Sequence, residues 1–213
     1  MRISRIQRLQ CLTSDRLGRG QVEQTEALCS AGARWIQFRM KRVDLISWIA
    51  VAQRVGEVCR RYGSIFVVND SIEVASAVGA DGVHLGKGDG SPLEARKRLG
   101  AEAIVGATVH DREEAVQALA GGVVDYLGIG PFRRSPTKGD FLPPLKEDEL
   151  NDLLDLSGEL PAVVIGGVTA LDVPNLISRG AHGVAVCSGL FADPDANLKA
   201  MLADYGKAMG KAA

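Results

Sequence analysis

Short apolar runs alternate with amphipathic stretches along the whole chain. The runs have strand length, and the stretches between them carry apolar residues at helical spacing. Eight strands are predicted, at residues 8–12, 35–38, 64–68, 82–85, 103–107, 125–129, 162–165 and 183–187. A predicted helix follows each strand, at residues 23–29, 45–61, 72–78, 92–99, 113–120, 147–156, 170–178 and 197–209.

This strict order of strand and helix predicts the fold class. Strands that alternate with helices pair in parallel through right-handed crossovers. Eight such units predict a closed (β/α)8 TIM barrel in the α/β class. The alternative is an open doubly wound sheet, which usually carries G-x-G-x-x-G after its first strand. Residues 13–18 read Thr-Ser-Asp-Arg-Leu-Gly instead. We therefore expect one barrel domain over residues 1–213.

The composition of the chain limits the kinds of molecule that it is expected to bind. The chain is 46% apolar and 24% charged, which is ordinary for a globular protein. Its 25 basic and 26 acidic residues give a net charge of −1, so bulk charge attracts neither nucleic acid nor an anionic membrane. The sequence contains no apolar run of membrane-spanning length, no signal-peptide pattern and no C-x-x-C pair. We expect a cytoplasmic protein with reduced thiols and small-molecule substrates; a homo-oligomer stays open.

Polar residues follow the second predicted strand. Gln37, Arg39 and Lys41 alternate, so they share one face of an extended chain, while Phe38 and Met40 share the other. In a barrel the carboxyl ends of the strands form the active-site mouth. An amide, a guanidinium and an ammonium at that mouth suit a multiply charged anion. A solvated strand end is the alternative.

Two acids follow the next two strands. Asp70 comes after the third strand and Asp89 lies in the glycine-rich turn after the fourth. Each has a plainer interpretation, Asp70 as part of a helix cap and Asp89 as a turn residue. Together at the mouth they would repel by about 4 kcal/mol at 4 Å and an effective dielectric of 20, which a bound cation reverses. The pair therefore predicts a site for Mg2+ carrying a polyphosphate.

A second anion site is predicted at the last three strands. The longest polar loop follows the sixth strand and carries Ser135, Thr137 and Lys138. Glycines or a small hydroxyl residue follow the seventh and eighth strands, where barrels often hold a phosphate with backbone N–H groups. The residues are Gly166, Gly167, Cys187 and Ser188. Thr108, after the fifth strand, is a further hydroxyl donor for a phosphate oxygen.

These segments, taken in order, resemble the thiamine-phosphate synthase (thiamine-phosphate pyrophosphorylase) family. The matching stretches are residues 37–41, 68–70, 79–89, 130–138 and 165–167. The resemblance implies a transferase that joins 4-amino-5-hydroxymethyl-2-methylpyrimidine diphosphate to hydroxyethylthiazole phosphate. Thiamine phosphate and pyrophosphate are the products, and Mg2+ is the cofactor.

The resemblance also implies roles for individual residues. Gln37 meets the pyrimidine, and the pyrophosphate is held by Arg39, Lys41, Asn69 and Lys138. Asp70 and Asp89 ligate Mg2+. The thiazole phosphate is held by Ser135, Thr137, Gly167 and Ser188, with backbone from Gly166 and Cys187. Thr108 matches a position at which serine is more usual.

Three departures from the family pattern are visible. Lys87 replaces a usual glutamine, Met40 replaces a common acid, and Arg133-Arg134 replaces an aromatic-proline pair. Two alternative functions remain, a thiazole tautomerase and a barrel that binds thiamine phosphate or its precursors without turnover. The tautomerase needs no diphosphate site and carries a histidine in the sixth loop, where this chain has Gly130-Pro131.

Overall fold

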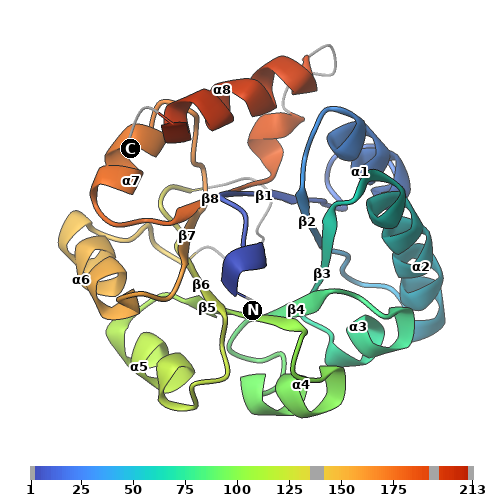
Figure 1. Cartoon of the computed structure of the whole chain (residues 1–213), viewed down its shortest axis with the longest axis horizontal. Coiled ribbons are helices and arrows are strands. Elements are labelled where there is room, and N and C mark those ends of the chain that lie inside the picture. Colours follow the sequence, from blue (N-terminus) through green and yellow to red (C-terminus); the bar gives the residue numbers. More distant parts are fainter. Residues whose placement is uncertain (1–2, 135–141, 192–196, 211–213) are drawn as a thin grey trace.

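The strands close into a single parallel ring in the order β1 to β8 (Figure 1). The computed structural model describes residues 3–134, 142–191 and 197–210. The strands are β1 (Leu9–Leu12), β2 (Trp35–Phe38), β3 (Ile65–Asn69), β4 (Gly82–Leu85), β5 (Ile104–Val109), β6 (Tyr126–Ile129), β7 (Ala162–Ile165) and β8 (Gly183–Val186). β8 pairs in parallel with β1, so the predicted (β/α)8 barrel is confirmed and the open sheet is wrong.

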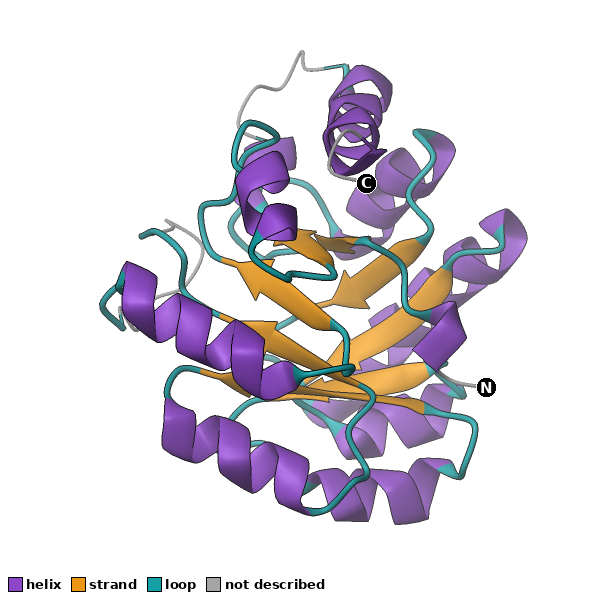
Figure 2. Ribbon diagram, turned by 60° about the vertical axis from the view of Figure 1, so that its left-hand side comes forward, coloured by secondary structure: helices purple, strands orange, loops and turns teal. Residues whose placement is uncertain are grey.

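In the described part of the chain, eight α-helices cover the outside of the ring (Figure 2). They are α1 (Gln21–Ser30), α2 (Leu45–Tyr62), α3 (Ile72–Val78), α4 (Pro92–Leu99), α5 (Arg112–Ala120), α6 (Glu147–Ser157), α7 (Val173–Ser178) and α8 (Leu198–Gly210). A short 3-10 helix, Ile3–Arg5, lies over the centre of the ring in Figure 1. No helix in the described part of the chain is long and apolar enough to cross a membrane.

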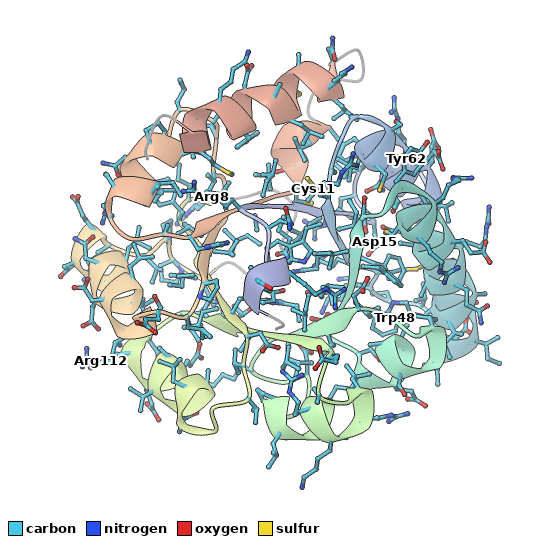
Figure 3. The ribbon with its side chains drawn as sticks, in the orientation of Figure 1. Arg8, Cys11, Asp15, Trp48, Tyr62 and Arg112 are labelled. Atoms are coloured by element: carbon cyan, nitrogen blue, oxygen red, sulfur yellow. The ribbon has the colours of Figure 1, made fainter. Side chains whose placement is uncertain are left out.

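Alternating side chains divide the core into two layers. Inward-facing Trp35, Tyr126 and Ile104 belong to a cluster inside the ring, where the Trp35 and Tyr126 ring centroids are 4.9 Å apart. Outward-facing residues such as Ile36 and Phe38 pack between strands and helices. Side chains occupy the ring in Figure 3, so its interior is a packed core rather than a channel.

Polar side chains set the starts of four helices. Asp44, Ser71, Ser91 and Asp111 each accept a backbone hydrogen bond from the third residue of α2, α3, α4 and α5 respectively. Each cap satisfies a donor that the first helical turn leaves without a partner. The predicted bounds of every strand and helix lie within three residues of the observed bounds. The largest difference is at α7, because Asp172 accepts from the Thr169 backbone N–H and holds a turn ahead of the helix.

Candidate active site

A cavity of about 210 Å3 opens at the carboxyl ends of the strands. Leu12, Ile165 and Ala185 form part of its apolar wall. Eight residues that the sequence predicted for the site line it: Gln37, Arg39, Asn69, Thr108, Gly166, Gly167, Cys187 and Ser188. Residues far apart in the chain therefore meet at the mouth predicted from strand order.

A separate hollow lies against the ends of β2, β3 and β4. Lys41, Asp70 and Asp89 line it, so the structure places the two acids and the lysine together. Lys41 is two residues after Arg39, and Asp70 directly follows Asn69. Lys41 Nζ forms an ion pair with Asp70 Oδ2. Burial raises the pKa of Asp89 above its usual value, and the neighbouring Asp70 carboxyl raises it further. The two carboxyl groups are thus neighbours in a partly desolvated hollow.

The backbone at Asp70 is held in a conformation unusual for its residue type. Asp70 has φ 70°, and Arg42, which lines the same hollow, has φ 59°. Such left-handed backbone costs energy for residues other than glycine and often marks functional sites. The side chain that caps α3 is Ser71, not Asp70. Interpreting Asp70 as the helix cap is therefore wrong, and its carboxylate faces Lys41 instead.

Asp89 also serves the local turn. Its Oδ2 accepts a hydrogen bond from the Gly86 backbone N–H at 2.8 Å, and its own N–H donates to the Gly86 carbonyl. This bond orients the carboxyl group beside Asp70. The interpretation of Asp89 as a turn residue is therefore confirmed. The same carboxylate can still bind a cation, because a carboxylate oxygen accepts more than one interaction.

A buried chain of hydrogen bonds runs behind the cavity. Gln37 Nε2 donates to Gln10 Oε1, and Gln10 Nε2 donates to the Tyr126 hydroxyl, both at 3.0 Å. The Tyr126 hydroxyl lies 2.9 Å from Nδ1 of His84. The other ring nitrogen of His84, Nε2, lies 2.7 Å from the Thr108 hydroxyl. Since the Tyr126 oxygen accepts from Gln10, its proton points to Nδ1, and Nε2–H then donates to Thr108. The Thr108 hydroxyl proton then remains available to another acceptor.

Two glycines make room for this chain of hydrogen bonds. A Cβ at Gly106 would lie 2.2 Å from the Tyr126 ring and 2.6 Å from His84 Nδ1. A Cβ at Gly128 would lie 2.9 Å from the His84 ring. His84 therefore packs and hydrogen-bonds within the barrel, as expected from its position on the strand.

The phosphate cradle predicted after β7 is built from two consecutive glycines with positive φ. Gly166 has φ 102° and Gly167 has φ 63°, which only glycine adopts without strain. A Cβ on Gly166 would lie 2.9 Å from Pro131, and one on Gly167 would lie 2.8 Å from Arg133 Cβ. The loops after β6 and β7 are thus in direct contact.

An ion pair holds these two loops together. Arg133 donates two parallel hydrogen bonds to the Asp172 carboxylate, each 2.6 Å long. Its backbone N–H also donates to the Gly166 carbonyl at 2.8 Å. The Arg133 guanidinium lowers the pKa of Asp172 from 3.8 to about 2. Such a bidentate pair orients the cradle before any ligand binds.

We expect this pair to stabilise the protein above about pH 4 and not at pH 2. The Asp172 pKa is lowered by folding, so its contribution is complete above the unfolded-state value and is lost as the pH falls toward about 2. Urea unfolding of the wild type and Asp172→Asn at pH 6 and pH 2.5 measures this. The stability difference between them should shrink at the lower pH. An equal difference at both pH values would contradict the assignment.

A cluster that the sequence did not reveal lies beside Thr108. Lys87 Nζ contacts Glu114 Oε1 at 2.9 Å, and His110 Nδ1 contacts Glu114 Oε2 at 2.9 Å. Burial raises the pKa of Glu114, but the hydrogen bonds from Lys87 and His110 outweigh it and the pKa is lowered. The unusual Lys87 therefore has a partner on α5. Only the four-residue spacing of His110 and Glu114 was a signal for this in the sequence.

Three predicted site residues, Ser135, Thr137 and Lys138, lie outside the described residues, so their predicted roles stay predictions.

Comparison with known proteins agrees with this geometry. The family model described as thiamine monophosphate synthase matches residues 9–190. This chain belongs to that family. A thiamine-phosphate synthase of Thioalkalivibrio sulfidiphilus is 42% identical, with 82% of each chain covered. A thiamine phosphate pyrophosphorylase structure from Pyrococcus furiosus is 28% identical over 96% of each chain, with a TM-score of 0.82.

Some relatives are much longer than this chain. A bifunctional ThiM/ThiE protein of Symbiobacterium thermophilum is 42% identical over 188 residues, which is 87% of this chain but 39% of that protein. A bifunctional ThiED protein of Geobacter sulfurreducens is covered over 36% of its length. The thiamine monophosphate synthase family expected from the sequence is thus confirmed, in a chain that matches one part of these bifunctional proteins.

Proposed function

We propose that this chain is a thiamine-phosphate synthase that joins 4-amino-5-hydroxymethyl-2-methylpyrimidine diphosphate to hydroxyethylthiazole phosphate. The observation that carries the proposal is the pairing of two unlike sites at one barrel mouth. One is a cavity whose described lining has arginines and no acid, and the other is a hollow where Asp70 and Asp89 meet Lys41. Two anionic substrates, one of them a diphosphate bound with a metal, match that division.

The residues of the acidic hollow fit Mg2+. Its ligands in proteins are oxygens, commonly one or two carboxylates together with phosphate oxygens and water. Asp70 Oδ2 is buried, makes no hydrogen bond with a described residue, and has the Lys41 ammonium as its ion partner. We assign Asp70 and Asp89 to hold Mg2+, which when bound neutralises charge that develops on the leaving diphosphate.

The chain's own residues bind, orient and stabilise charge. The bond between the pyrimidine methylene carbon and the diphosphate oxygen breaks, and its electron pair leaves with the pyrophosphate. Arg39, Lys41, Asn69 and Lys138 stabilise the growing negative charge as donors oriented before reaction. The thiazole nitrogen then forms the new C–N bond to the methylene carbon. This course requires no protein nucleophile.

The buried hydrogen bonds give Gln37 and Thr108 their part in this reaction. Gln37 is 2% exposed and its amide is fixed by Gln10, so it presents one orientation to a pyrimidine ring. Thr108 is fixed from behind by His84. Gly166, Gly167, Cys187 and Ser188, with Ser135 and Thr137 of the loop after β6, receive the thiazole phosphate. Rigid positioning of both rings lowers the entropic cost of bringing them together.

The acidic hollow favours the synthase over the two alternatives. A thiazole tautomerase or a carrier barrel would need the phosphate cradle but not a second, metal-binding anion site. Neither a tautomerase nor a carrier barrel would need Asp70, Asp89 and Lys41 for its function. The cytoplasmic location and the oligomeric state stay predictions from the sequence.

A coupling assay tests the proposal. Purified protein is mixed with the pyrimidine diphosphate, the thiazole phosphate and Mg2+, and thiamine phosphate is followed by thiochrome fluorescence. We expect product that disappears when EDTA replaces free Mg2+. Absence of product from protein that binds the thiazole phosphate would reject the synthase and favour the tautomerase or the carrier.

A further inference from the structure

Two consecutive arginines after β6 have different surroundings. Arg133 is fully engaged, with Asp172 at its guanidinium, the Gly167 carbonyl at 3.3 Å and the Phe132 ring centroid at 4.5 Å. Arg134 lines the cavity, and no hydrogen bond or ion pair joins its guanidinium to any residue of the described ranges. One arginine therefore holds the loops together, while the charge of its neighbour is uncommitted.

Arg134 lies over the predicted phosphate cradle. A Cβ built on Gly167 would be 3.2 Å from the Arg134 carbonyl oxygen. The backbone of Arg134 is thus in near contact with the glycine assigned to the thiazole phosphate. Within the described residues this part of the cavity also has backbone N–H groups, the Ser188 hydroxyl and the Arg133 guanidinium, whose charge is neutralised by Asp172. A described cation without an acidic partner would add charge complementary to a phosphate dianion there.

Two arginines of the cavity lining, Arg39 and Arg134, have guanidinium groups without an acidic partner among the described residues. Among the described lining residues, Arg39 is the other arginine whose guanidinium has no hydrogen bond or ion pair. Arg39 follows β2 and Arg134 follows β6, on opposite sides of a ring of eight strands (Figure 1). No described acid lines the cavity, so neither charge is neutralised there. One cation faces each half of a site for two anions.

We propose that Arg134 is a substrate-binding residue that contacts the phosphate of the thiazole substrate, as Arg39 serves the diphosphate on the opposite wall. The inference rests on the proposed function for the identity of the ligand. The interaction adds a charge-assisted contact to a cradle of neutral donors. It is specific for the phosphate rather than the thiazole ring, so it discriminates against the unphosphorylated alcohol.

Binding and kinetics of three variants test the proposal. Arg134→Ala and Arg134→Lys are compared with Arg112→Ala, which removes the same charge from the outer surface at α5 (Figure 3). Calorimetry measures the Kd of hydroxyethylthiazole phosphate and of hydroxyethylthiazole alcohol for each. Steady-state assays give KM for both substrates, and thermal melting checks that each variant folds.

Arg134→Ala should raise the Kd of the thiazole phosphate about tenfold, because it removes a charged contact at a partly exposed site. The Kd of the thiazole alcohol should stay unchanged. Arg134→Lys should restore part of the affinity, and Arg112→Ala should match the wild type. KM for the pyrimidine diphosphate should stay constant. An unchanged Kd for the thiazole phosphate in Arg134→Ala, or an equal loss for the alcohol, would overturn the proposal.

The two proposals fail separately. If the wild type makes no thiamine phosphate but Arg134→Ala loses phosphate-dependent binding, the assignment of Arg134 stands and the synthase is rejected. If the wild type is active and the Kd is unaffected by the substitution, the synthase stands and the assignment of Arg134 is rejected.

Discussion

Replacing Asp89 by alanine is expected to lower kcat by about 10^3-fold or more, because the variant loses half of the carboxylate pair assigned to Mg2+. Several kcal/mol of stabilisation of the leaving diphosphate depend on that pair. Asp89 lies beside Asp70, and burial together with this neighbour raises its pKa, so the two carboxyl groups repel unless a cation lies between them. The measurement is the thiochrome coupling assay at saturating substrates.

Binding of Mg2+ gives a second readout that does not depend on turnover. Titration calorimetry with Mg2+ and pyrophosphate should show weakened binding in Asp89→Ala. The variant removes one of two repelling charges but also the hydrogen bond from the Gly86 N–H, so thermal melting without metal checks that it still folds. Glu94→Ala is the matched control, since Glu94 lines the same hollow without belonging to the pair. Full activity and unchanged Mg2+ affinity in Asp89→Ala would show that the acids have another task.

The barrel was predictable because its signals are local and repeated. Each strand is a short apolar run, the stretches between strands have helical spacing, and some helices begin at a capping residue such as Ser71 or Ser91. Where a predicted strand end differs from the observed one, contacts between distant parts of the chain set the observed end. β5 continues to Val109, past the predicted end at residue 107, because its backbone pairs with β6 as far as Ile129.

The candidate site was predictable to the extent that strand order places residues. Gln37, Arg39 and Asn69 come directly from strands that end at the mouth, and the cavity contains all three. Side-chain pairing between distant elements was not predictable. Nothing in the spacing of Gln10, Tyr126 and His84 shows that they share a hydrogen-bond chain, since each contact joins residues far apart in sequence.

The two arginines after β6 illustrate the same limit. In the sequence Arg133 and Arg134 are equivalent extra charges beside a phosphate site. In the structure both line the cavity, but the Arg133 guanidinium is bound to Asp172 on the next loop, whereas the Arg134 guanidinium has no hydrogen bond or ion pair with a described residue. Backbone hydrogen bonds hold the segment after β6 against the end of β7, where Phe132 donates to Ile165 and Arg133 donates to Gly166.

The largest expected loss of stability comes from Arg96, far from the cavity lining. Arg96 is on α4, and its guanidinium donates to the Asp125 carboxylate at 2.6 Å and to the carbonyls of Ala103 and Val123. Asp125 is 1% exposed and also accepts from the Val105 backbone N–H at 2.8 Å. A helix and the starts of β5 and β6 are thus joined through one buried ion pair.

Arg96→Ala should lower the free energy of unfolding by about 3–5 kcal/mol, because it leaves the buried Asp125 carboxylate without its cation and two carbonyls without their donor. Urea unfolding followed by circular dichroism measures the loss. Arg96→Ala combined with Asp125→Asn should be less destabilised than the two single losses added together, since the second substitution removes the unpaired charge. Arg112→Ala breaks an exposed pair with Asp152 and should cost at most about 1 kcal/mol. If Arg96→Ala cost no more than Arg112→Ala, or if the two single losses simply added, the buried pair would not be what joins α4 to the barrel.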